Sequence, residues 1–115
     1  MTSEPESRRF LIHIRLGGGA QADRAHILDV ARHLKETARH ISNGECHLAY
    51  TSHDACTMGY FVKTALDTKN IKKQITSTRD SSVLLNDDSI MILELGRAFD
   101  GIGFSGAWSW LQHHP

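Results

Sequence analysis

The chain has 115 residues, a length that fits one domain whose hydrophobic core needs no metal or disulfide to hold it together. Hydrophobic residues make up 40% and charged residues 23%, which is typical of a soluble globular protein. Thirteen basic and thirteen acidic residues balance, so the overall charge does not indicate nucleic acid or an anionic membrane as a partner. No apolar run is long enough to span a bilayer. Cys46 and Cys56 are the only cysteines, and we expect reduced thiols in a cytoplasmic protein.

The first predicted strand spans residues 10–16 and follows a polar tail, residues 1–8, that we expect to be disordered. Apolar and more polar side chains alternate along this strand, which is the pattern of a half-buried strand. A glycine triplet at 17–19 ends it. The backbone N–H groups of these glycines, with Arg24 nearby, would be able to bind an anion. Because the run matches no phosphate-binding fingerprint, we favour a flexible connection.

A helix is predicted over 22–42, where apolar residues recur at three- and four-residue intervals and form one stripe. Asn43 and Gly44 then supply the left-handed backbone that commonly ends a helix. Two strands follow at 46–51 and 57–64, joined by a polar turn. A second helix is predicted over 66–77, with Thr64 and Asp67 as a capping pair, and the last strand over 89–95.

The order strand, helix, strand, strand, helix, strand predicts an α+β fold. The matching architecture is a ferredoxin-like βαββαβ sandwich, with one antiparallel sheet and two helices on one face. This domain is predicted to span 9–96. The glycine- and aromatic-rich tail, 97–115, is expected to pack on its own sheet or on a partner's sheet, and no local structure is predicted for it.

The last predicted strand is apolar on both sides, although one side must face away from the helices. Either Met91, Leu93 and Leu95 face the helices and Ile90 and Ile92 are exposed, or the reverse holds. Each assignment leaves apolar side chains uncovered, which indicates a partner surface. We expect a second copy of the chain or the tail to cover them. The predicted surface consists of Ile90, Ile92, Trp108 and Trp110.

Three segments carry a resemblance to a known family: the run Thr57–Thr64, the run 86–95 after a short helix, and the late segment 106–111. Together they resemble the small CRISPR-associated adaptation subunit and its stand-alone relatives, over most of the chain from Phe10 onward. The resemblance implies a compact ferredoxin-like homodimer.

Members of that family that act as metal-dependent nucleases hold the metal with an aspartate at the end of the first strand. Arg15 lies near that position in this chain, and no Asp or Glu occurs between Glu6 and Asp23. A hard divalent cation needs oxygen ligands, which a guanidinium cannot supply. The resemblance therefore implies the fold and the dimer, and it leaves nuclease activity in doubt.

Basic residues gather along the first predicted helix, and histidines recur there every seven residues, at His26, His33 and His40. A seven-residue spacing places these imidazoles about 10 Å apart, which is too far for one metal ion. We interpret this side of the helix as a basic solvent face. Any nucleic-acid binding should be weak and salt-dependent, because it would rely on a local patch. The predicted nucleic-acid or anion patch consists of Arg15, Arg24, Arg32, Lys35 and Arg39.

Cysteines and histidines on the predicted hairpin, Cys46, His47, His53 and Cys56, lack the ligand spacings of common zinc modules. Nothing in the sequence pairs either thiol with a particular histidine for nucleophilic catalysis. We therefore expect no metal site, no cofactor and no catalytic residue.

These observations predict a small cytoplasmic, homodimeric binding or regulatory module without catalysis of its own, and with no membrane partner. Two alternatives stay open. The first is a metal-dependent nuclease or toxin-like enzyme that uses Asp87, Asp88 or Asp100. The second is a nucleic-acid-binding protein that does not cleave, and that binds through the first helix and Arg15.

Overall fold

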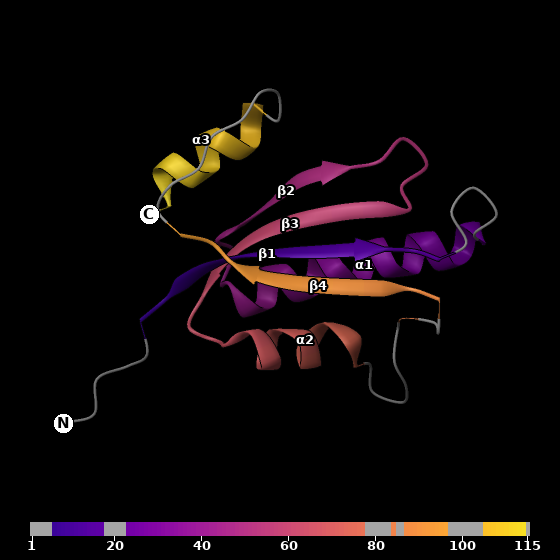
Figure 1. Ribbon diagram of the computed structural model, residues 1–115, viewed down its shortest axis with the longest axis horizontal. Coiled ribbons are helices and arrows are strands. Elements are labelled where there is room, and N and C mark those ends of the chain that lie inside the picture. The colour runs from indigo at the N-terminus through magenta and orange to yellow at the C-terminus, as the bar shows by residue number, and fades with distance from the viewer. Residues whose placement is uncertain (1–5, 18–22, 78–83, 85–86, 97–104, 115) are drawn as a thin grey trace.

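The computed structural model describes residues 6–17, 23–77, 84, 87–96 and 105–114 (Figure 1). Its elements are β1 (Arg8–Arg15), α1 (Arg24–Ile41), β2 (Cys46–Thr51), β3 (Thr57–Thr64), α2 (Thr68–Thr76), β4 (Ser89–Glu94) and α3 (Ser105–His113). The predicted order of strands and helices is confirmed up to β4. The helix α3, within the tail, was not predicted.

The four strands form one sheet in the order β2-β3-β1-β4, and every neighbouring pair is antiparallel. The central strands are β3 and β1, and β2 and β4 lie at the two edges (Figure 1). Because β3 lies between β1 and β2, the first strand–helix–strand unit is split, as in ferredoxin-like proteins. The predicted α+β fold class is confirmed.

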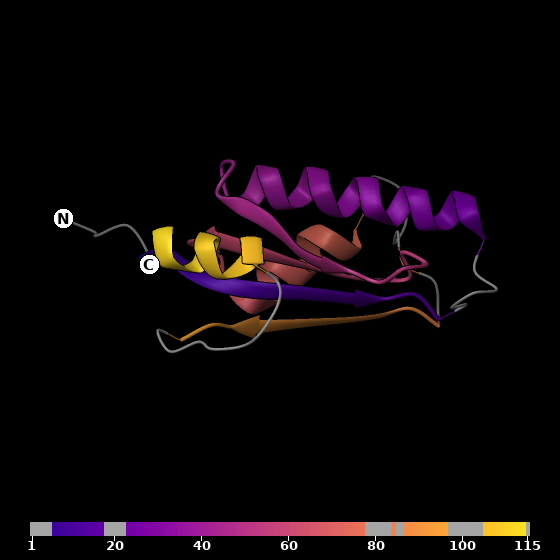
Figure 2. The ribbon, with the colours of Figure 1, turned by 90° about the horizontal axis from the view of Figure 1, so that it is seen from above.

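The main core lies between one face of the sheet and the helices α1 and α2, which lie on the same side of it (Figure 2). Alternation along β1 sends Phe10, Ile12 and Ile14 into this core, where each is fully buried. Apolar residues of both helices pack against them: Val30, Leu34, Ala38, Ile71 and Ile75. No helix among the described residues is long and apolar enough to cross a membrane.

Side chains and left-handed residues fix the helix ends. Asp23 caps α1 by accepting from the Ala25 N–H (3.1 Å), and Asn43 at φ 53° follows the end of this helix, as predicted. Asp67 caps α2 by accepting from the Asn70 N–H (2.8 Å). The predicted Thr64–Asp67 capping pair is wrong, because Asp67 itself is the N-cap, while the Thr64 hydroxyl donates to the Ile41 carbonyl (2.7 Å) and accepts from the Leu66 N–H (3.3 Å).

The two edge strands differ in regularity. The register between β2 and β3 shifts between Leu48 and Tyr50, which marks a β-bulge. The register between β4 and β1 is unbroken from Glu94 opposite Phe10 to Ser89 opposite Arg15. The sheet therefore has one interrupted edge and one regular edge.

Candidate functional site

One face of the sheet points away from α1 and α2, and we call it the open face. Strand alternation and register determine which side chains it carries. One row of neighbours runs across all four strands, through Tyr50, Gly59, His13 and Met91. The adjacent row contains Phe61, Leu11 and Leu93. We describe the part of the open face near β2 and β3 as its β2 half, and the part on β4 as its β4 half.

The helix α3 covers the β2 half. A second hydrophobic cluster joins Phe61 to Ala107, Trp110 and Leu111, with Leu11, Ala49 and Leu95 packed against it. The Trp110 ring stacks on Phe61, with 5.7 Å between the ring centroids, and only 8% of Trp110 is exposed. The helix α3 thus packs on the sheet of its own chain.

Arg9 fixes the C-terminal end of α3 to the sheet. Its guanidinium donates to the Leu111 carbonyl (3.1 Å) and to the Gly96 carbonyl, and the side chain is buried. A cation near the last carbonyls of a helix also interacts favourably with the helix dipole. Arg9 is therefore a structural residue that holds α3 over the β2 half.

Gly59 on β3 lets the Tyr50 side chain of β2 lie across the neighbouring strand. A Cβ on Gly59 would lie 2.3 Å from the Tyr50 ring, so the ring lies directly on the β3 backbone. This position brings the Tyr50 hydroxyl to 2.5 Å from His13 Nδ1 on β1. Burial raises the pKa of Tyr50 above its ordinary value, so the phenol stays protonated near neutral pH.

The β4 half of the open face is apolar and exposed. Met91 is 47% exposed and Leu93 44% exposed, and both point away from α1 and α2. The structure thus selects the second of the two predicted assignments. The prediction that Ile90 and Ile92 form the exposed sheet surface is corrected, because both pack against the main core. Their register explains this: Ile92 lies opposite Ile12 and Ile90 opposite Ile14, and both partners are core residues.

Trp108 and Trp110 were both predicted to belong to the surface that covers the sheet, and the structure describes the side chain of Trp110 alone. Trp110 covers the β2 half, as described above. Trp108 belongs to α3, but its side chain lies outside the described part of the chain.

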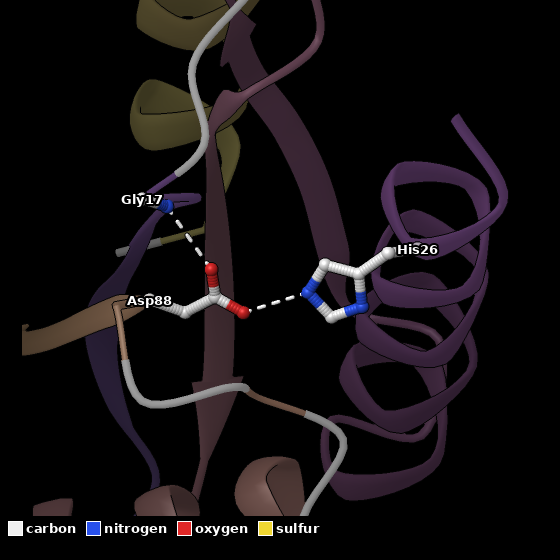
Figure 3. Close-up of polar contacts among 3 residues, drawn as sticks. All are labelled: Gly17, His26 and Asp88. Carbon is white, nitrogen blue, oxygen red and sulfur yellow. Dashed lines mark hydrogen bonds and ion pairs between the residues drawn. The ribbon is translucent and has the colours of Figure 1, made fainter. Parts of the chain in front are cut away.

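A second polar cluster joins the start of β4 to α1. The Asp88 carboxylate accepts from the Gly17 N–H (3.0 Å) with one oxygen and lies 2.7 Å from His26 Nε2 with the other (Figure 3). The Asp88 side chain is only 4% exposed. Gly17 also passes so close to Asp87 that an added Cβ would lie 2.2 Å from its carbonyl oxygen. The first glycine of the triplet thus serves a contact within the chain, whereas Gly18 and Gly19 lie outside the described residues.

The predicted basic patch does not form one surface. Arg24, Arg32, Lys35 and Arg39 are all exposed on α1, where Arg32 also pairs with Asp29 (3.1 Å). Arg15 alternates with the core residue Ile14 and therefore points to the open face, whereas α1 packs on the opposite face. The structure does not bring Arg15 together with the four residues of α1.

The histidines of α1 have different environments. His26 pairs with Asp88, His33 Nε2 donates to the Ile75 carbonyl on α2 (2.8 Å), and His40 is exposed. Among the described residues, no three His, Cys, Asp or Glu side chains lie close enough together to hold a metal ion. Asp100 lies outside the described part of the chain.

Cys56 is not poised as a nucleophile. Burial, and then the Asp54 carboxylate nearby, raise the pKa of its thiol, which keeps the sulfur protonated near neutral pH. The Asp54 carboxylate is held ionised because hydrogen bonds from Ser52 and from the Cys56 N–H lower its pKa. Both hydrogen bonds belong to the turn between β2 and β3.

Two features of the open face were not predicted from the sequence, the Tyr50–His13 contact and the buried Arg9. A glycine inside a strand is a signal for close backbone approach, and Gly59 carries that signal. No comparable signal marks Arg9, because its partners are backbone carbonyls far along the chain.

Comparisons with known proteins give no relative. No family model matches the chain, and neither a curated protein nor a solved structure is significantly similar to it.

Proposed function

We propose that this chain is a small binding or regulatory module that acts as a homodimer through the β4 half of its open face and has no catalysis of its own. The observation that carries the proposal is the exposure of Met91 and Leu93, two residues apart on the same side of β4. Exposed apolar side chains that lie together on a sheet are typical of a contact surface.

A second copy is the partner that this surface favours. Dimers with two-fold symmetry use the same patch on both subunits, so each copy would cover the Met91 and Leu93 of the other. The resemblance to the small CRISPR-associated adaptation subunit and its relatives supports a homodimer, without indicating which surface forms it. Because α3 already occupies the β2 half, the contact would be small. We therefore expect a dimer that forms at micromolar concentration and dissociates on dilution.

The non-catalytic part of the proposal rests on the chemistry of the acidic residues. Both oxygens of Asp88 are used by Gly17 and His26, which favours a structural role for this carboxylate. Arg15 stands near the place where nucleases of the resembling family hold their metal. A guanidinium there would repel the cation that phosphodiester cleavage needs. A cytoplasmic location belongs to the same proposal and is supported by Cys46 and Cys56, which form no disulfide.

Sedimentation velocity over a range of concentrations tests the dimer. We expect the dimer mass for the native chain and the monomer mass for Met91→Glu/Leu93→Glu, with the thermal unfolding of the two proteins similar. A carboxylate on each of these exposed positions would have to be desolvated without a partner in the contact. Leu28→Glu is the matched control, because Leu28 is 58% exposed on α1, away from the open face. A native chain that stays monomeric at high concentration would overturn the proposal.

A further inference from the structure

The outer edge of β4 carries backbone groups that point away from the sheet. The Leu95 N–H donates to the Arg9 carbonyl (2.8 Å), so odd-numbered residues at this edge hydrogen-bond to β1. In an antiparallel pair such residues alternate with residues whose N–H and C=O groups point outward. Those outward-facing residues are Ile90, Ile92 and Glu94. Within the described part of the chain, no strand pairs with this edge.

This edge lacks a bulge, a proline and a lysine, and its one charged residue is Glu94 at the end of the strand. Natural edge strands are commonly protected by a bulge, a proline or a lysine. The other edge strand, β2, has such a bulge between Leu48 and Tyr50. In contrast, β4 is regular, has no proline or lysine, and four of its six residues are apolar. The β4 edge is therefore competent to accept another strand.

A groove runs along this edge, between α2 and β4. Its volume is about 330 Å³, and it is lined by Ile90 and Ile92 from the strand and by Thr68, Lys69 and Lys72 from the helix. Its floor is thus apolar and its rim basic. No acidic residue lies in α2, and neither Lys69 nor Lys72 forms an ion pair with any residue that the structure describes. The groove has the charge to accept carboxylates.

We propose that the α2–β4 groove binds an extended segment of a partner protein in which glutamates alternate with apolar residues, and that this segment adds to β4 as a fifth strand. Side chains of an added strand alternate between the two faces of the sheet. On the helix side, glutamates would pack their aliphatic stems over Ile90 and Ile92 and extend their carboxylates to Lys69 and Lys72. On the other side, apolar residues would lie beside Met91 and Leu93.

A second copy of the chain fits this groove less well. Antiparallel pairing of β4 with its own copy would place two α2 helices on the same side of the joined sheet. Each helix carries Lys69, Lys72 and Lys73, and like charges brought together at an interface are unfavourable. The open face is thus suited to self-association and the α2–β4 groove to an acidic strand, and the two surfaces meet at Met91 and Leu93.

Residue-resolved amide exchange tests the proposal, with a short synthetic peptide of alternating glutamate and valine, capped at both ends, as the probe. In the free protein, the N–H groups of Ile90, Ile92 and Glu94 should exchange quickly, and those of Met91 and Leu93 slowly. A saturating amount of the peptide should slow the outward-facing groups by at least about tenfold, since they would then be hydrogen-bonded. A peptide with lysine in place of glutamate, or with alternate amides methylated, should not protect them.

A second test compares a variant with reversed charge in the groove with a variant that has the same charge change elsewhere. Lys69→Glu/Lys72→Glu should weaken peptide binding by about tenfold or more, and added salt should weaken binding to the native chain. Lys35→Glu/Arg39→Glu changes the net charge equally on the exposed side of α1 and should leave binding unchanged. Equal losses in both variants would overturn the proposal, as would outward amides that the peptide does not protect. Outward amides already protected in the free protein, in a concentration-dependent way, would also overturn it in favour of a second copy.

Discussion

The two halves of the open face show how the same chain can close one part of a sheet and leave another part available. In the β2 half, α3 covers Phe61, Arg9 holds the end of that helix, and Tyr50 lies across Gly59. The β4 half keeps Met91 and Leu93 exposed on a regular edge strand. An apolar pattern alone therefore does not identify a contact surface, because both halves are apolar and only one is covered by the chain itself.

The largest expected effect comes from removing the cover of the β2 half. Trp110→Ala should lower the free energy of unfolding by about 3 kcal/mol, because a buried aromatic ring that stacks on Phe61 is lost. Chemical denaturation measures this loss. Gln112→Ala, at an exposed position of the same helix, is the control and should have little effect. Equal stability of the two variants would contradict the role of α3 as a cover.

A smaller effect should follow when α3 loses its anchor. Arg9→Met keeps the buried aliphatic stem but removes the guanidinium from the Leu111 and Gly96 carbonyls, at a cost of about 2 kcal/mol. Amide exchange in α3 should accelerate more than exchange in α1. Arg15→Met, on the same side of the same strand but exposed, should change neither quantity. Unchanged exchange in α3 would show that the helix is held without Arg9.

At the other edge of the sheet, the Asp88 side chain fixes the start of β4 by contacting Gly17 and His26. Asp88→Asn should lower stability by about 1 kcal/mol, because the charge-assisted contact with His26 is lost while the Gly17 N–H keeps an acceptor. Asp87→Asn changes an exposed neighbour and should be neutral. The same two variants also test the alternative function, a metal-dependent nuclease that uses Asp87 or Asp88. Metal-dependent nuclease activity that disappears in a stably folded Asp88→Asn protein would favour that alternative over a structural role.

The smallest expected effect is a change of stability with pH that depends on two tyrosines, Tyr50 on the open face and Tyr60 in the main core. Burial raises the pKa of Tyr50, and also of Tyr60, in the folded chain above the ordinary value of 10.0. The folded state therefore holds these protons more tightly than the unfolded state, so stability is retained below about pH 10 and falls as the pH rises through the folded pKa. Thermal unfolding between neutral and strongly alkaline pH should show a smaller alkaline loss in Tyr50→Phe. Identical alkaline losses in both proteins would contradict the burial of the phenol.

The sequence was informative wherever local signals decide the structure. The bounds of β2 and β3 were predicted to the residue, because polar turn residues flank both strands. The two faces of β4 could not be told apart, because Ile90 and Met91 are equally apolar and only the pairing with β1 distinguishes them. The helix α3 escaped prediction because its main contacts, on Phe61 and Arg9, come from strands distant in the sequence. The exposed side of β4 depends on cross-strand register, and α3 depends on distant partners, so neither could be predicted from the sequence.

The central claim is that the β4 half of the open face is where the chain associates with itself. Methyl NMR of the native protein during dilution tests it most directly, because each exposed methyl group reports its own surroundings. We expect the methyl resonances of Met91 and Leu93 to shift as the dimer dissociates over the micromolar range, while those of Leu28, exposed on α1, stay constant. Resonances of Met91 and Leu93 that do not move with concentration, or a shift confined to Leu28, would contradict the claim.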